Sequence, residues 1–117
     1  MHKAMITIGM LTSSTILLAQ ASPYSNLTGQ FTITGKDALD PPPGQKRDRL
    51  GLFLTGDSAK RTYNAMTATP INGDACEDGL RLKKAGGLVC ASHRGKNYTC
   101  SVAIVLATGQ TKPIGTC

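Results

Sequence analysis

The clearest strand pattern in the chain covers residues 98–106, where larger apolar residues recur at every second position. A period of two places successive side chains on opposite faces of a strand, so we predict a strand here. Shorter alternations predict further strands at residues 30–34, 50–54 and 80–83. Residues 88–92 are also predicted to form a strand, with Leu88 and Cys90 on one face. The more apolar face of the longest strand consists of Tyr98, Cys100, Val102, Ile104 and Leu106.

Glycine and asparagine separate the later strands, which indicates tight turns between antiparallel neighbours. Turns are predicted at residues 85–87, 94–97 and 108–110. By contrast, residues 36–49 contain three consecutive prolines followed by a charged run. Consecutive prolines lack backbone donors and favour an extended polyproline form, so we interpret residues 36–49 as a surface loop. Residues 68–78 are also predicted to form a loop.

Apolar residues at spacings of four and seven predict one helix, which continues to about residue 67. Asp57 or Ser58 is placed to cap its N-terminus. The pattern directs Ala59, Tyr63 and Met66 to the core, and Lys60, Arg61 and Asn64 to water. Together these elements predict an α+β domain, with a three- or four-stranded antiparallel sheet and one packed helix.

The first 21 residues have the features of a cleaved secretory signal. Lys3 provides a positive charge, an apolar run follows to Leu18, and a small-x-small pattern ends at Ala21. Cleavage is therefore predicted between Ala21 and Ser22. The apolar run is shorter than the ~20 residues that span a bilayer. We expect a single domain at residues 22–117, without a membrane span, in the periplasm or secreted.

All four cysteines follow the predicted signal, and an even number in an exported chain indicates disulfides. Four cysteines allow three pairings. A turn at residues 94–97 places Cys90 opposite Cys100 on adjacent strands, at a separation suited to a disulfide. Elimination then pairs Cys76 with Cys117. These crosslinks would stabilise a small domain that contains no tryptophan.

A zinc site is a weaker alternative for these cysteines. The chain contains no Cys-x-x-Cys motif, and His93 is the only histidine after the predicted signal. The spacing of Cys90 and His93 would allow both to bind zinc, but an oxidising compartment favours disulfides. We predict no metal and no cofactor.

Charge is distributed unevenly along the chain, whose formal net charge is +6. Residues 22–78 contain six basic and seven acidic residues, whereas residues 79–117 contain six basic residues and no acidic one. Such asymmetry attracts anions, although a basic surface also simply maintains solubility. The predicted anion-binding residues are Arg81, Lys83, Lys84, Arg94, Lys96 and Tyr98, with Tyr98 offering a ring for stacking.

Enzyme motifs are poorly matched. Gly56-Asp57-Ser58 is similar to the Gly-Asp-Ser block of an esterase and lipase family, but His93 lacks the Asp-x-x-His context of that family. Helix capping explains the same residues. Gly35-Lys36 is followed by Asp37 where a phosphate-binding loop requires Ser or Thr. We therefore predict a protein that is not an enzyme.

The order of several residues resembles a loose group of small exported bacterial proteins of uncharacterised function. The resemblance covers about half of the mature chain and implies a periplasmic α+β domain with a Cys90–Cys100 bridge. Cys76, Cys117 and the three prolines depart from that pattern. The residues that carry it are Gly56, Ala59, Lys60, Tyr63, Met66, Leu88, Cys90, Tyr98, Cys100 and Gly109.

Two functions remain open at this point. The first is a non-enzymatic periplasmic or secreted binding module whose basic face binds an anionic partner, either a cell-envelope polymer or a lipid headgroup. Export favours such partners over nucleic acid. The second is an inhibitor or immunity protein that binds an exported enzyme or toxin, a role that disulfide-rigidified loops suit.

Overall fold

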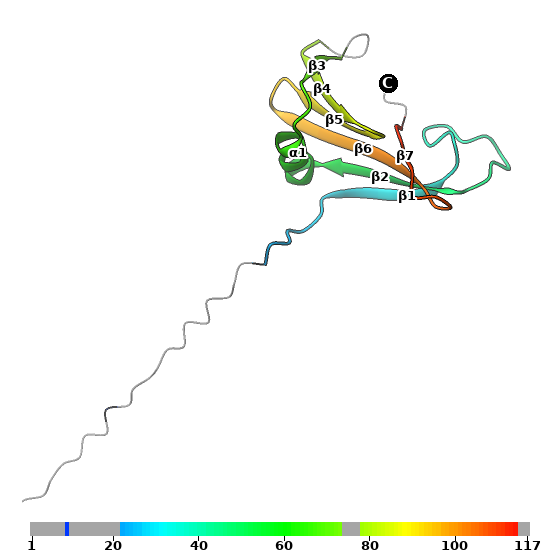
Figure 1. Ribbon diagram of the computed structural model, residues 1–117, viewed down its shortest axis with the longest axis horizontal. Coiled ribbons are helices and arrows are strands. Elements are labelled where there is room, and N and C mark those ends of the chain that lie inside the picture. The colour runs from blue at the N-terminus through cyan, green and yellow to red at the C-terminus, as the bar shows by residue number, and fades with distance from the viewer. Residues whose placement is uncertain (1–8, 10–21, 74–77, 115–117) are drawn as a thin grey trace, which may run out of the picture.

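The chain forms one antiparallel sheet with a helix on one of its faces (Figure 1). The computed structural model describes Gly9, residues 22–73 and residues 78–114. No helix in this part of the chain has the length and apolar character needed to cross a membrane. In chain order the elements are β1 (Gly29–Thr34), β2 (Arg49–Thr55), α1 (Gly56–Ala65), β3 (Ile71–Asn72), β4 (Leu80–Ala85), β5 (Leu88–His93), β6 (Asn97–Val105) and β7 (Thr111–Lys112).

The predicted sheet of three or four strands was too small, because the described residues form seven strands in the order β1-β2-β6-β5-β4-β3, with β7 also on β6. The nine-residue strand β6 accounts for the difference. One side of β6 pairs with β2, and its other side pairs first with β5 and then with β7. The hairpins β1–β2 and β4–β5 therefore join a single sheet.

All five predicted strands are present, and β3 and β7 were not predicted. These two strands contain two residues each, which is too short for any period to be visible. The turn between β5 and β6 is also where the sequence predicted it. Its central residues Arg94 and Gly95 have φ values of 57° and 71°, and Lys96 N–H bonds to the His93 carbonyl. Both features are typical of a tight turn at residues 93–96, and the register pairs His93 with Asn97 across it.

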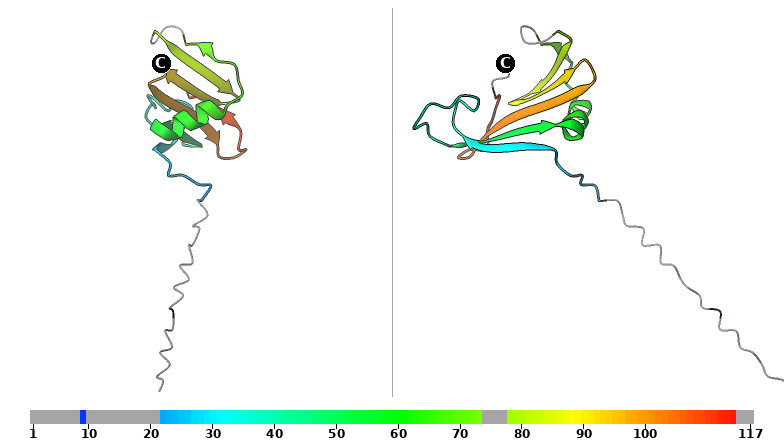
Figure 2. Two further views of the ribbon diagram at one scale, coloured as in Figure 1. Left: turned by 90° about the vertical axis from the view of Figure 1, so that its left-hand side faces the viewer. Right: turned by 180° about the vertical axis from the view of Figure 1, so that it is seen from behind.

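One face of the sheet carries α1, which crosses β6 and β5 (Figure 2). Ala59 and Tyr63 of the helix are buried against Cys90 and Cys100, and these cysteines form a disulfide. The two cysteines are directly paired in the β5–β6 register, as the sequence predicted. Ala59 is completely buried, and its carbonyl oxygen lies 3.5 Å from Cys100 Sγ. Leu54, Met66, Leu88 and Tyr98 pack around this cluster.

The opposite face has a second set of buried residues, which alternate with the first along β5 and β6. Val89, Ala91 and Ala103 are buried here together with Ile114, which follows β7. Gly51 of β2 lies beneath Ile114. A Cβ at position 51 would lie 3.1 Å from Thr32 Cγ2 and 3.5 Å from Ile114 Cδ1, so a larger residue would crowd this contact.

The helix begins and ends earlier than predicted. Its N-cap is Thr55 rather than Asp57 or Ser58, no side chain caps it by a hydrogen bond, and its last residue is Ala65. Gly56 starts the helix with a φ of 55°, which lets the chain turn directly from β2 into α1 without a loop. Ser58 serves another purpose, since its Oγ accepts a hydrogen bond from the Thr28 N–H at 2.8 Å.

Some predictions fall outside the described residues. Cys76 and Cys117 lie there, so their proposed pairing stays a prediction. The same holds for the predicted signal, of which only Gly9 is described, and for its cleavage site after Ala21.

Replacing Ala59 by leucine is expected to destabilise the fold by about 1–3 kcal/mol, because overpacking a filled core costs that much. Ala59 has no exposed surface and contacts the disulfide cluster. Ala65→Leu is the matched control, because Ala65 is exposed in the last turn of the same helix. Urea unfolding measures both variants. Equal stability of the two variants would contradict the packing described here.

Candidate functional site

The predicted basic residues do not share one face of the sheet. Strand β4 pairs with β5 so that Lys83 lies opposite Cys90, which places Lys83 on the face that carries α1. Arg81 lies on the same face, two residues away. Lys84 is paired with Val89 and lies on the other face. A continuous surface of all six predicted residues is therefore excluded by the pleat of the strand.

Lys83 has a structural role at the end of the helix. Its ammonium group donates hydrogen bonds to the carbonyl oxygens of Tyr63 and Met66, both at 3.0 Å. The same Nζ lies 4.5 Å from the centre of the Tyr63 ring. Carbonyl groups in the last turn of a helix lack intrahelical partners and carry partial negative charge, so a cation is stabilising there. Lys83 thus fastens α1 to β4.

Arg94 also makes a structural contact, although it remains exposed. Its Nε donates a hydrogen bond to the Asp78 carbonyl oxygen at 3.0 Å, linking the β5–β6 turn to the segment before β4. The Arg94 backbone N–H bonds to the Gly79 carbonyl. The turn is therefore held from two sides, by the β5–β6 ladder and by Arg94.

Tyr98 lies beside both a second tyrosine and a lysine of the helix. Its ring packs edge-on against the Tyr63 ring, with a centroid separation of 5.5 Å. Lys60 Nζ lies 5.9 Å from the centre of the Tyr98 ring. Across the sheet, Tyr98 pairs with Ser92, and Ser92 pairs with Arg81. The small side chain of Ser92 leaves Arg81 and Tyr98 as the large groups of this row.

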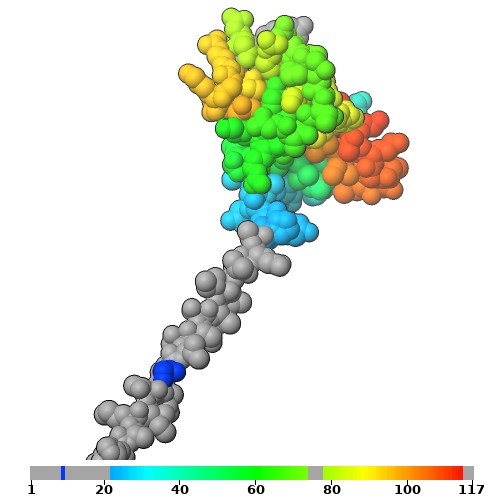
Figure 3. Space-filling view, turned by 60° about the vertical axis from the view of Figure 1, so that its left-hand side comes forward, coloured from blue at the N-terminus to red at the C-terminus, as the bar shows by residue number. Residues whose placement is uncertain are grey.

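We name these residues the Tyr98 cluster: Lys60, Arg81, Arg94, Lys96 and Tyr98. All four basic members are exposed, and Tyr98 is half-buried. Ion pairs within the described residues join Arg49 to Asp48 and Arg61 to Asp57, and neither includes a member of the cluster. Figure 3 shows the β5–β6 turn, which contains Arg94 and Lys96, projecting above α1.

Lys60 is the member that sequence reasoning missed. The helical pattern correctly directs it away from the core, and an exposed lysine on a helix has no further signature. Its relation to Tyr98 arises only when α1 packs across β6. The signal that could have suggested it is Tyr98 itself, an aromatic residue on the strand face that the helix must cover.

The residues considered for hydrolysis are separated by the sheet. Ser58 is on α1, and its hydroxyl is engaged with Thr28, whose Oγ1 lies 3.0 Å away. His93 is on the opposite face, and its Nε2 lies 3.3 Å from Thr99 Oγ1. The geometry does not bring Ser58 and His93 together. Within residues 22–73 and 78–114, no three His, Cys, Asp or Glu side chains gather as a metal site requires.

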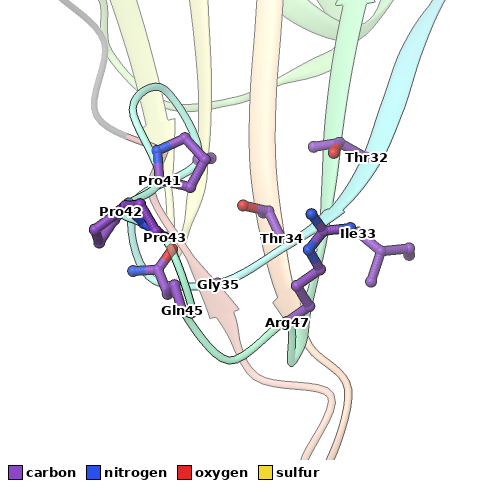
Figure 4. A pocket seen from close by; sticks show the side chains of 11 residues that line it. Thr32, Ile33, Thr34, Gly35, Pro41, Pro42, Pro43, Gln45 and Arg47 are labelled. Atoms are coloured by element: carbon purple, nitrogen blue, oxygen red, sulfur yellow. The ribbon is translucent and has the colours of Figure 1, made fainter.

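The proline-containing loop encloses a hollow of about 420 Å³ at the far end of the sheet (Figure 4). Thr32, Ile33 and Thr34 of β1 form one wall, and residues 41–45 form the other. Arg47 is the charged residue in its lining. A hydrogen bond of 2.9 Å from Gln45 to Asp37 ties the loop to itself. This hollow is distant in the fold from the Tyr98 cluster and brings no acid and base together.

Lys83→Met is expected to destabilise the protein by about 1.5–3 kcal/mol, because two hydrogen bonds from a charged donor to helix carbonyls are lost. Lys84→Met changes net charge equally but removes an exposed side chain on the other face, so its stability should change by less than about 0.5 kcal/mol. Thermal and urea unfolding of the two variants provide the comparison. A larger loss for Lys84→Met would contradict the assigned role.

Comparison of the chain with known proteins found no matching family model, no matching curated protein and no matching solved structure.

Proposed function

We propose that this protein is a non-enzymatic binding module of the periplasm or cell exterior, and that its Tyr98 cluster binds an anionic component of the cell envelope. The observation that carries the proposal is that four exposed cations belong to the segments next to one half-buried tyrosine, with Lys60 Nζ 5.9 Å from the centre of its ring. Lys60 lies near this ring from α1, and Arg81 shares its cross-strand row through Ser92. Arg94 and Lys96 belong to the turn that leads into β6.

The electrostatics of this end favour anions. From Gly79 onward the chain has six basic residues and no acidic one, and the residue that precedes this segment is Asp78, whose carbonyl accepts a hydrogen bond from Arg94. Each Lys or Arg close to an anionic surface contributes about 1 kcal/mol of attraction, which falls off within a Debye length. Several exposed cations that act together therefore suit a partner carrying repeated negative charges better than a single small anion.

The rigidity of the cluster supports the same function. The Cys90–Cys100 disulfide joins the two strands that lead into the β5–β6 turn, and the hydrogen bond from Lys96 N–H to the His93 carbonyl closes the turn. Tyr98 is held by the Tyr63 ring. Groups that are already ordered lose less conformational entropy on binding, so a larger share of the electrostatic attraction contributes to affinity.

Neutralising the three cluster cations whose side chains make no hydrogen bond within the described part of the chain tests the proposal. Lys60→Gln, Arg81→Gln and Lys96→Gln are combined, whereas Arg94 is kept because it fastens the turn. Binding is measured by co-sedimentation with phosphatidylglycerol vesicles and, separately, with lipopolysaccharide, over a range of salt concentrations. We expect the triple variant to bind about a hundredfold more weakly, from about 1 kcal/mol per removed cation.

The matched control combines Lys36→Gln, Lys46→Gln and Arg47→Gln, which removes the same charge from the proline-containing loop. If the control loses as much affinity as the cluster variant, binding depends on net charge and the proposed site is wrong. Wild-type protein that fails to bind either probe contradicts the proposal outright. Capture of one exported protein in stoichiometric amount would instead support the inhibitor hypothesis.

A further inference from the structure

Strand β1 forms an open edge of the sheet. It pairs on one side with β2 and is the last strand in the order β1-β2-β6-β5-β4-β3. Among the described residues no other strand borders its outer side, as Figures 1 and 2 show. An open edge presents unpaired N–H and C=O groups that can template pairing with another strand.

The register identifies which backbone groups face outward. Thr55 N–H donates to the Thr28 carbonyl at 3.1 Å, so this pair occupies a hydrogen-bonded position next to the β1–β2 ladder. In an antiparallel ladder such positions recur at every second residue. Gln30, Thr32 and Thr34 therefore face β2, and Phe31 and Ile33 direct their N–H and C=O groups to the open edge.

The side chains of these two residues are also unusually exposed. Phe31 is 71% exposed and Ile33 is 43% exposed, although both lie on the face that carries α1. The helix covers only one end of this face, around Cys90 and Cys100. Beyond it an apolar shelf remains, in which the side chains from β2 and β6 are only half-buried. The shelf consists of Phe31, Ile33, Leu50, Leu52, Val102 and Ile104.

Charge distinguishes this edge from most of the molecule. No residue from Ser22 to Gly35 is charged, in a chain whose formal net charge is +6. Natural edge strands commonly carry lysine or proline that blocks pairing, and β1 has neither. Two copies of a basic protein repel each other at most orientations, but they can approach along β1 without placing like charges of this strand against each other.

We propose that β1 pairs with β1 of a second copy in antiparallel orientation, which forms a two-fold symmetric dimer with one continuous sheet. A two-fold axis near Phe31 or Thr32 pairs odd-numbered residues with odd-numbered residues, so the outward backbone groups of one copy meet those of the other. Paired residues share a face in an antiparallel ladder. The two apolar shelves therefore join on one side, where Phe31 and Ile33 of both copies cover each other.

Sedimentation equilibrium of the mature chain, residues 22–117, tests the proposal from micromolar to millimolar concentration. We expect a concentration-dependent dimer, with amide hydrogen exchange at Phe31 and Ile33 slowing as the dimer forms. Phe31→Lys is expected to abolish the dimer, because it places like charges close to the axis. Leu39→Lys is the matched control, since Leu39 is 66% exposed on the proline-containing loop, and this variant should dimerise normally.

A second variant separates loss of pairing from loss of folding. Phe31→Glu alone should also be monomeric, whereas an equimolar mixture of Phe31→Lys and Phe31→Glu should form a mixed dimer through opposite charges across the axis. A wild-type chain that stays monomeric at millimolar concentration overturns the proposal. So does a dimer that survives Phe31→Lys, or a mixture of the two folded variants that remains monomeric.

Discussion

The packing of α1 on the Cys90–Cys100 pair is the interaction on which the rest of the structure depends. The disulfide fixes the β5–β6 register, and that register determines the face of every residue on β6 and on the strands that pair with it. Ala59 can approach the two sulfur atoms because its side chain is a single methyl group. This close approach brings Lys60 over Tyr98 and the helix C-terminus to Lys83.

Much of the fold was predictable because alternation reports which residues share a face. Residues 98–106 and the Cys90–Cys100 pairing followed from period and turn position alone. The two-residue strands carried no period, and joining both hairpins to β6 required knowledge of distant pairing that a single sequence does not contain. The start of the helix was misjudged because Asp57 and Ser58 are good capping residues. In the structure the helix begins earlier, at Gly56, whose positive φ turns the chain from β2 into α1.

The candidate site was predictable only in part, for a related reason. Composition identified a basic segment, but charge alone cannot separate Lys83, which bonds to helix carbonyls, from its neighbour Lys84, which is exposed on the other face. The distinction depends on the pleat and on where the helix ends. Lys60 became part of the site through tertiary packing. The outcome is a cluster of five residues, drawn from α1, β4, the β5–β6 turn and β6, in place of the six residues that the sequence indicated.

The β5–β6 turn shows a competition between backbone preference and side-chain use. Arg94 adopts a φ of 57°, a conformation that costs a residue with a Cβ about 1–2 kcal/mol and that glycine or asparagine would adopt more readily. The guanidinium offsets part of this cost by bonding to the Asp78 carbonyl. Position 94 therefore retains a side chain that the local backbone conformation disfavours. A hydrogen bond from this side chain to a segment outside the hairpin compensates for part of the strain in the turn.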